Sequence, residues 1–325
     1  MNQNLSRRRF LSASIAGAIA ADGAISGGAS NLPVRVLGRT GVHVPILGIG
    51  CGMSWWDAYK EEDRALEALS LAVDLGVTYI DTGQSYGKGL SETWIGKCLK
   101  DRRKEVFIAT KISTRSGDEA LRETDRCLKR LQTDQIDLIH IHNLKGLDDL
   151  ASIEAKGGLL EVVYKLRDQK LARFIGITSH HDPSALKTAL ERHDFDCTQM
   201  ALNAALQGAE EGNTSRLGHS FESVSLPVTK RKNIGAIAMK VTGRNALIGD
   251  EPAKADAGNL LRYSLSLPIS VAVVGMSKLD YIRQNAELAR NFQPMPRSSM
   301  EELSGRLAAR HKAALDRHFS NHQDA

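Results

Sequence analysis

Four residues of this sequence have the types needed to protonate an oxygen at which negative charge develops. Asp81, Lys111 and His142 each end a short apolar segment, and Tyr86 follows Asp81 in a loop that contains two glycines. Reduction of a carbonyl by hydride transfer leaves negative charge on the oxygen, which must be protonated or hydrogen-bonded as the charge forms. A tyrosine has a reference pKa of about 10, and a neighbouring ammonium favours its ionised form. These residue types therefore fit carbonyl chemistry if the fold brings them together.

The elements that must position these residues alternate between short Val- and Ile-rich runs and helical stretches. The pattern predicts eight strands, at 46–50, 78–81, 106–111, 136–142, 174–178, 198–202, 234–240 and 270–274. It predicts helices after them at 63–75, 91–100, 118–131, a stretch that ends near 169, 183–191, 217–232, 255–267 and 279–290. Apolar strands joined by helices are typical of a parallel sheet, and eight such units in about 250 residues favour a closed barrel. We therefore expect an α/β fold, a (β/α)8 TIM barrel.

Two further elements are expected outside the eight units. Residues 34–37 and 42–45 flank the sequence Gly38-Arg39-Thr40-Gly41, which predicts an N-terminal hairpin that caps the bottom of the barrel. Residues 299–317 have the polar, amphipathic pattern of a C-terminal helix. In a barrel of this type the active site lies at the carboxyl ends of the strands. The four residues named above should therefore meet at one mouth.

The same residues carry a resemblance to the aldo-keto reductase family. The sequence reads DTGQSYG at 81–87, followed by SE at 91–92, ATK at 109–111, and DL at 137–138 with His142. The order and spacing resemble the family's elements over residues 32–290. The resemblance implies an NAD(P)-dependent oxidoreductase that transfers a hydride between a nicotinamide cofactor and a carbonyl or alcohol substrate (aldehyde, ketone or aldose). It also implies the catalytic roles: Tyr86 is the acid, Lys111 tunes it, Asp81 holds Lys111, and His142 donates to or orients the substrate oxygen.

The resemblance places the cofactor in the second half of the chain. The residues that it implies for cofactor binding are Thr178, Ser179, Gln199, Met239, Gly275, Ser277, Lys278, Gln284 and Asn285. Ser179 stands where the family has asparagine, so its reach to the nicotinamide carboxamide is shorter. Tyr281 stands where strongly NADP-selective members have an arginine. Ser277 and Lys278, however, suit a 2′-phosphate, and because of them we expect NADP(H) rather than NAD(H).

Two other classes of protein stay open from the residues alone. His140 and His142 point to the same face of one strand, and paired histidines at a barrel strand end also occur in metal-dependent hydrolases. A nucleotide-binding protein with little turnover is the second alternative. In the oxidoreductase interpretation no metal is expected. The adjacent His180 and His181 fit either a plain loop or a position that lines the site.

The substrate is only broadly indicated. The stretch YGKGLSE at 86–92 is similar to sugar-oxidising members of the family. The expected partner is therefore a small-molecule carbonyl or sugar substrate, and the same residues can catalyse the reaction in either direction.

The first thirty residues are a different kind of sequence. They contain Ser6-Arg7-Arg8-Arg9-Phe10-Leu11 and then an uncharged run of small residues, which is the layout of an export signal and looks like the twin-arginine type. The run is too short and too rich in small residues for a stable membrane span. We therefore expect a signal segment at 1–30 and a single barrel domain at 31–325. We also expect the twin-arginine translocation machinery as a partner and a periplasmic or otherwise exported location.

Composition excludes several classes of protein. With 325 residues, 42% of them hydrophobic and 25% charged, the chain is neither collagen-like nor disordered. The formal net charge is +5, and the first thirty residues contribute two of those charges. The rest of the chain is close to neutral, so no nucleic-acid partner is expected.

Overall fold

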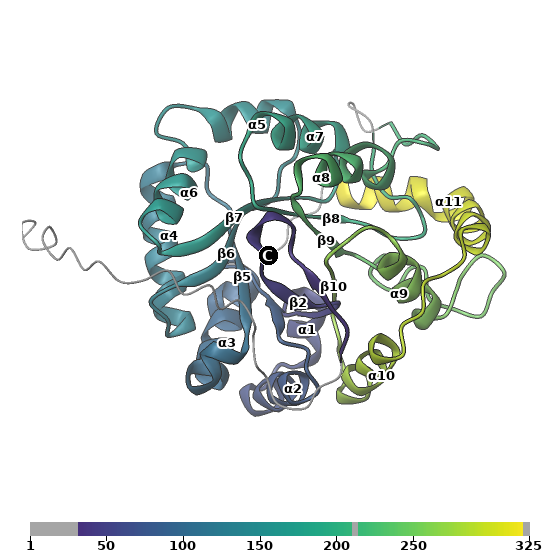
Figure 1. The fold of residues 1–325 in the computed structure, drawn as a ribbon, viewed down its shortest axis with the longest axis horizontal. Coiled ribbons are helices and arrows are strands. Elements are labelled where there is room, and N and C mark those ends of the chain that lie inside the picture. The colour runs from purple at the N-terminus through teal and green to yellow at the C-terminus, as the bar shows by residue number, and fades with distance from the viewer. Residues whose placement is uncertain (1–31, 210–213, 321–325) are drawn as a thin grey trace, which may run out of the picture.

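Eight parallel strands close into a barrel, which confirms the predicted (β/α)8 architecture (Figure 1). The computed structural model describes residues 32–209 and 214–320, so the predicted export signal lies outside the described residues. Around the barrel the strands follow the order β10, β3, β4, β5, β6, β7, β8 and β9. Their bounds are β3 Leu47–Gly50, β4 Tyr79–Asp81, β5 Phe107–Ile112, β6 Ile136–Ile141, β7 Ala172–Ser179, β8 Cys197–Ala201, β9 Gly235–Met239 and β10 Val271–Val274. Because every neighbouring pair is parallel, all the carboxyl ends open at the same end of the barrel.

Helices follow the strands and cover the outside of the barrel (Figure 1). Their bounds are α2 Glu62–Asp74, α3 Leu90–Leu99, α4 Gly117–Leu131, α6 Leu159–Asp168, α7 Pro183–Arg192, α8 Leu226–Lys232, α9 Ala257–Ser266 and α10 Leu279–Arg290. Two short helices were not expected as separate elements. They are α1 Met53–Ala58, which precedes α2, and α5 Leu147–Glu154, which precedes α6.

The helix expected at 217–232 begins later than the sequence pattern indicates. Ser220 caps it, because its side chain accepts a hydrogen bond from the backbone N–H of Ser223 and the Ser223 hydroxyl accepts one from the backbone N–H of Ser220. A π-helical turn at Phe221–Ser225 then leads into α8. The cap satisfies orphan backbone donors, so the helix starts at this position.

The barrel has two apolar layers, because successive side chains on a strand point to opposite faces. The inner layer includes Tyr79 and Phe107, whose rings stack with centroids 5.3 Å apart. The outer layer packs between the strands and the helices. The strands are therefore buried on both faces, which explains their nearly continuous apolar sequence.

An antiparallel hairpin closes the amino end of the barrel, as predicted. It consists of β1 Val34–Val36 and β2 His43–Pro45. Leu37 and Val44, both fully buried, join the inner apolar layer. The Ser270 hydroxyl, just before β10, donates to the carbonyl of Val36. The hairpin thus lies at the starts of the strands, and the opposite end is the mouth.

Two long loops and the C-terminal helix border the mouth. The described parts of these loops are residues 202–209 and 214–220 after β8 and residues 240–256 after β9. The helix, α11 Arg297–Ser320, is yellow in Figure 1 and is longer than the predicted 299–317. It contacts both loops, because Lys312 Nζ donates to the carbonyl of Gly208 and His311 Nε2 lies 2.6 Å from the carbonyl oxygen of Ala253. The end of the chain is therefore part of the surroundings of the mouth.

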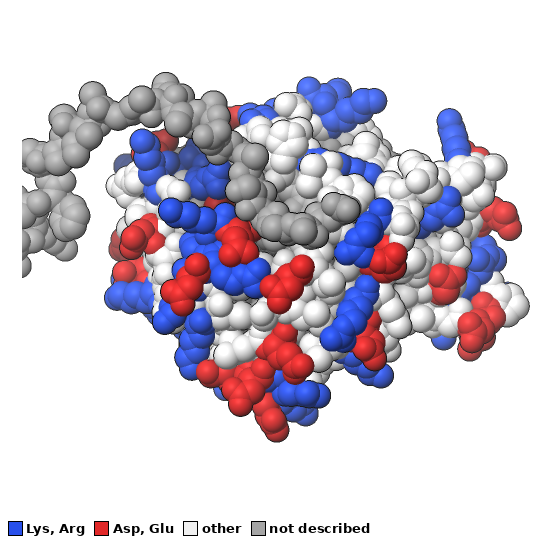
Figure 2. All heavy atoms as spheres, turned by 60° about the horizontal axis from the view of Figure 1, so that its bottom comes forward, with Lys and Arg blue, Asp and Glu red and all other residues white. Residues whose placement is uncertain are grey.

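Acidic and basic side chains are mixed on the surface. The face shown in Figure 2 carries both signs interspersed rather than in separate fields. Within the described ranges, none of the helices combines the length and the apolar character that crossing a bilayer requires.

Candidate active site

Three of the four predicted catalytic residues form one compact group at the mouth. Lys111 is 2% exposed, and its Nζ donates to Asp81 Oδ2 at 2.7 Å and to the carbonyl of Thr82 at 2.6 Å. The same Nζ lies 5.0 Å from the centroid of the Tyr86 ring. The ammonium is therefore fixed between a carboxylate and the phenol, which is the arrangement that the sequence predicts.

His142 completes the group from the next strand. Its ring meets the Tyr86 ring edge-on, with centroids 6.2 Å apart and an interplanar angle of 85°. Its Nδ1 lies 3.4 Å from the hydroxyl of Ser113. The ammonium of Lys111 and the imidazole of His142 thus both lie beside the Tyr86 ring, a combination of groups that can stabilise charge on a substrate oxygen.

Glycines make room for the Tyr86 ring. A Cβ atom added at Gly83 would lie 3.2 Å from Tyr86 Cζ, and one at Gly52 would lie 3.4 Å from Cε2. A side chain at Gly83 would therefore require the ring to shift by a few tenths of an ångström.

The remaining motif residues brace the strand ends. The hydroxyls of Thr82 and Ser91 lie 2.8 Å apart, and Ser91 also donates to the carbonyl of Cys51. Glu92 is fully buried and accepts a hydrogen bond of 2.6 Å from Thr110, the residue before Lys111. The DT and SE elements of the sequence thus hold the backbone around Asp81 and Lys111.

A cavity of about 640 Å³ opens beside this group. Predicted site residues line most of its length: Asp81, Tyr86, Gln199, Met239, Gly275, Ser277, Gln284 and Asn285. Lys111 and His142 border Tyr86 and do not line the cavity themselves. One continuous space thus joins the catalytic group to the segment after β10, and its size suits a small-molecule site.

The residues predicted to bind the nicotinamide carboxamide lie on β7 and β8. Thr178 and Gln199 are register partners, and both are buried. Among the described residues, Thr178 Oγ1 and Gln199 Oε1 have no hydrogen-bond partner. Buried polar atoms are rarely left unpaired, so this pair fits an amide group of a bound cofactor. The Ser179 hydroxyl instead donates to the carbonyl of Leu144 at 2.9 Å, and its predicted role in cofactor binding stays a prediction.

The nucleotide segment lies at the other end of the cavity. Ser277, Gln284 and Asn285 line it, whereas Lys278 Nζ lies 5.3 Å from the centroid of the Tyr281 ring. The cation therefore lies beside Tyr281, a residue of the cavity lining, and its predicted role in cofactor binding stays a prediction.

Sequence reasoning missed part of the cavity wall. Lys240, Arg244 and Asn245, from the loop after β9, line the cavity. All three have positive φ angles, 57°, 55° and 68°. Lys240 ended a predicted strand and could have been noticed for that reason, but no local pattern indicated the loop's left-handed turns.

His140 lies deeper in the barrel. It is fully buried, and a Cβ atom added at Gly176 would lie 2.4 Å from its Nδ1. Burial, with smaller contributions from the charges of Lys111 and His142, lowers the pKa of His140 well below its usual value. Within residues 32–209 and 214–320, no three His, Cys, Asp or Glu side chains are grouped as metal ligands. These described residues therefore provide no set of ligands for the metal ion that the hydrolase alternative requires.

The histidine pair after β7 is divided between two environments. His180 lines the cavity and is 2% exposed, whereas His181 is partly exposed and is not part of the lining. The His180 ring meets the His142 ring at 6.0 Å and stacks on Phe319 at 6.1 Å. His180 therefore has a position that lines the site, whereas His181 belongs to the loop outside the cavity lining.

Comparisons with known proteins agree with this geometry. A sequence model of the Aldo/keto reductase family matches residues 47–262. The chain is 27% identical to L-galactose dehydrogenase from Arabidopsis thaliana over 304 residues, which cover 82% of this chain and 91% of that protein. An aldo-keto reductase from Bacillus halodurans in its holo form has the same fold, with a TM-score of 0.68, 22% identity, and coverage of 85% of this chain and 96% of that one. An aldo-keto reductase from Klebsiella pneumoniae in complex with NADPH also has this fold, with a TM-score of 0.63, 19% identity, and coverage of 87% and 97%. The chain therefore belongs to the aldo/keto reductase family and is an NAD(P)-dependent oxidoreductase that acts on carbonyl substrates.

Proposed function

We propose that this enzyme uses NADP(H) to interconvert a small aldehyde, ketone or aldose with its reduced or oxidised partner. The observation that carries the proposal is the cavity that joins Tyr86, with Lys111 and Asp81 behind it, to the segment at 275–285. One end holds groups for proton transfer, and the other holds groups suited to a nucleotide.

The residues of the chain perform the proton chemistry. In the reducing direction, the Tyr86 phenol donates its proton to the carbonyl oxygen as that oxygen gains negative charge. The Lys111 ammonium, held by Asp81, stabilises the negative charge left on the phenolic oxygen. His142 donates a hydrogen bond to the same substrate oxygen. In the oxidising direction, Tyr86 accepts the proton instead.

The cofactor supplies the hydride when it is bound. Thr178 and Gln199 would hold its carboxamide, because their buried polar atoms need partners. Met239 would pack against the nicotinamide ring, since a thioether makes favourable contacts with rings. Ser277 and Lys278 support the choice of NADP(H), because a serine hydroxyl and an ammonium suit a 2′-phosphate.

A substrate panel tests the proposal. Aldehydes, ketones and aldoses are measured with NADPH and NADH, and alcohols and aldoses with NADP⁺ and NAD⁺. We expect turnover, with a higher kcat/KM for the phosphorylated cofactor. The aldose arm is included because the name of the Arabidopsis relative gives a sugar as its substrate. The absence of turnover with both cofactors in both directions would refute the proposed activity.

We also propose that the enzyme is exported in a folded state through the twin-arginine route. The support is the sequence Ser6-Arg7-Arg8-Arg9-Phe10-Leu11 followed by an uncharged run. Such a route would allow the cofactor to be bound before export. Fractionation of cells that express the full chain tests this: the protein should reach the periplasm, and the double substitution Arg7→Lys, Arg8→Lys should retain it inside. An equal distribution of the two variants would contradict it.

A further inference from the structure

His180 provides a second imidazole at the mouth, beside that of His142. Its ring lies edge-on to His142, with centroids 6.0 Å apart, and His142 in turn borders Tyr86. Tyr86 and His142 are the groups proposed to contact the reacting oxygen, and His180, which lies beside His142, lines the cavity. Two oxygens on neighbouring carbons are closer together than these rings, so one substrate could contact both imidazoles.

The backbone of His180 is held on both sides. Its N–H donates to Asn143 Oδ1 at 3.2 Å, and its carbonyl accepts a hydrogen bond of 2.9 Å from Gln207 Nε2. Gln207 is itself fixed, because its Oε1 accepts from Asn203 Nδ2 at 3.0 Å. Two side-chain amides thus fix the backbone on either side of the His180 side chain.

The ring is held as well. Phe319, from the last turn of α11, is 1% exposed and stacks on the His180 ring at an interplanar angle of 13°. Lys240 Nζ lies 5.3 Å from the centroid of the Phe319 ring, and Lys240 also lines the cavity. The imidazole is therefore fixed in orientation by packing, as a specific binding group must be.

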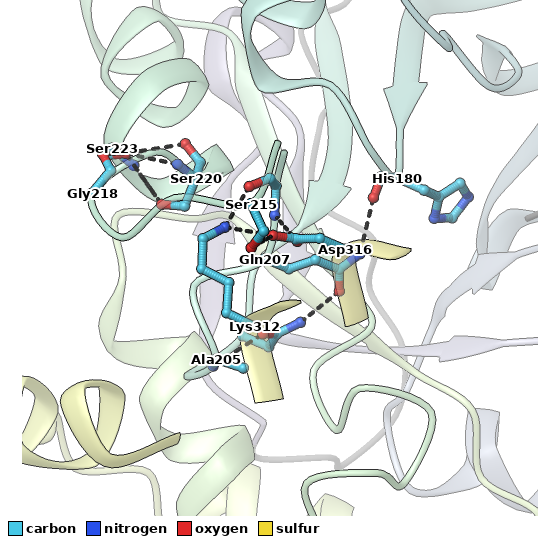
Figure 3. Close-up of polar contacts among 11 residues, drawn as sticks. His180, Ala205, Gln207, Ser215, Gly218, Ser220, Ser223, Lys312 and Asp316 are labelled. Atoms are coloured by element: carbon cyan, nitrogen blue, oxygen red, sulfur yellow. Dashed lines mark hydrogen bonds and ion pairs between the residues drawn. The ribbon is translucent and has the colours of Figure 1, made fainter. Parts of the chain in front are cut away.

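A buried ion pair on α11 supports this arrangement from behind (Figure 3). Lys312 and Asp316 have side-chain exposures of 3% and 1%, and Lys312 Nζ lies 2.8 Å from Asp316 Oδ2. Asp316 also accepts hydrogen bonds from the backbone N–H of Gly208 and from the hydroxyl of Ser215, while Lys312 donates to the carbonyl of Gly208. Gly208 follows Gln207 in the chain. The helix thus fixes Gly208, the chain neighbour of Gln207, and Gln207 hydrogen-bonds to His180.

A buried ion pair is a poor device for stability alone, because desolvation of two charges offsets most of their attraction. Here both members of the pair hydrogen-bond to the backbone of Gly208, so the pair holds that part of the loop in one position. The same helix also supplies Phe319, which stacks on the ring of His180. The helix α11 thus supports His180 in two ways, through the loop at Gln207 and Gly208 and through the Phe319 ring.

We infer that His180 hydrogen-bonds to an oxygen on the carbon next to the reacting carbonyl, so that the enzyme selects α-hydroxy carbonyl compounds, including aldoses. An imidazole can donate or accept such a bond. A site that hydrogen-bonds a substrate hydroxyl discriminates against the analogue that lacks it, because that hydrogen bond is then lost. The inference rests on the proposed function and names the substrate class of the same site.

2-Hydroxypropanal and propanal form the matched pair of substrates, because they share the carbonyl and the carbon number and differ only in the hydroxyl on the carbon next to the carbonyl. We measure kcat/KM for both with NADPH in the wild type, His180→Ala, His180→Gln and the control His181→Ala. The wild type should prefer 2-hydroxypropanal, and His180→Ala should reduce that preference by about tenfold or more. His180→Gln should retain part of it, and His181→Ala should retain it fully.

Binding of NADPH, followed by its fluorescence, shows whether each variant is folded. If His180→Ala fails to bind NADPH, the comparison rests on His180→Gln and on Phe319→Leu, which removes the stacked ring. An unchanged preference in the folded His180 variants would overturn the inference, as would a wild type without preference or an equal loss in His181→Ala. Wild-type protein that turns over no substrate at all would overturn the proposed function instead.

Discussion

The Lys111 ammonium and the Asp81 carboxylate form a buried ion pair, with Nζ and Oδ2 2.7 Å apart and side-chain exposures of 2% and 6%. Lys111 also donates to the carbonyl of Thr82, so its charge is held in one position next to the Tyr86 ring. The pair thus links the architecture of two neighbouring strands to the acid that acts at the mouth.

Substitution of Asp81 by Asn should destabilise the fold and reduce turnover. Removal of one partner leaves the Lys111 ammonium buried without its counter-charge, which costs about 3–5 kcal/mol. Urea unfolding should show this loss, and kcat should fall together with it. The double variant Asp81→Asn, Lys111→Met should be more stable than Asp81→Asn alone. A single variant that unfolds at the wild-type midpoint would show that the pair does not carry this energy.

Substitution of Tyr86 by Phe should separate chemistry from binding. The ring still fits beside Gly83, but the proton donor is lost, so kcat should fall by roughly 10²- to 10⁴-fold. The dissociation constant for NADPH, measured by fluorescence, should stay the same. A variant with wild-type turnover would show that another group protonates the substrate.

Substitution of Lys278 by Ala should weaken NADPH binding selectively. A charge-assisted hydrogen bond contributes roughly 1.5–3 kcal/mol, so KM for NADPH should rise by about one to two orders of magnitude, while KM for NADH stays the same. Arg283→Ala is the matched control, since Arg283 lies on α10 with its side chain 55% exposed and pairs with Asp280. An equal rise for both cofactors would mean that Lys278 does not contact the 2′-phosphate.

Substitution of Gly176 by Ala should strain the barrel interior. The added Cβ would lie 2.4 Å from His140 Nδ1, and overpacking of this kind costs about 1–3 kcal/mol. With His140→Ala in the background, the same change should cost less, although part of the cost should remain because the added Cβ would also lie 2.8 Å from the backbone carbonyl oxygen of Cys197. Gly305→Ala is the control, because a Cβ there meets nothing within 4 Å and α11 should gain stability. Equal effects of Gly176→Ala in both backgrounds would exclude the contact.

The buried imidazole of His140 should make stability fall in weak acid. Burial lowers its pKa in the folded protein, while the unfolded chain takes up the proton below about pH 6.5. The unfolded state then binds more protons, so the free energy of unfolding decreases as pH drops from 7 to 5, by up to about 1.4 kcal/mol per pH unit. Urea unfolding of the wild type and of His140→Leu at both pH values measures this. The variant should have the shallower slope, and equal slopes would contradict the assignment.

Much of the barrel could be predicted because its strands are apolar on both faces and its motif residues end them. Asp81, Lys111 and Tyr86 meet as expected, since parallel strands bring their carboxyl ends together. Local sequence patterns depend on only a few neighbouring residues. They predicted one helical stretch where the structure has α5 and α6, and they did not predict α1.

The substrate side of the mouth could not be predicted, because it depends on contacts between distant parts of the chain. Asp316 bonds to Gly208, 108 residues away, and Phe319 stacks on His180. No periodicity in either segment records such a partner. From the sequence, His180 and His181 were therefore equally possible lining residues, although in the structure His180 lines the cavity and His181 does not.

The hairpin at the base of the barrel has a practical consequence for handling the enzyme. Its first strand begins at Val34, on the end of the barrel opposite the mouth. A surface linker or reporter protein joined ahead of Leu32 would be attached at the closed end, and the substrate entrance would face the solution. Immobilisation through the amino terminus should thus give an oriented, accessible catalyst layer.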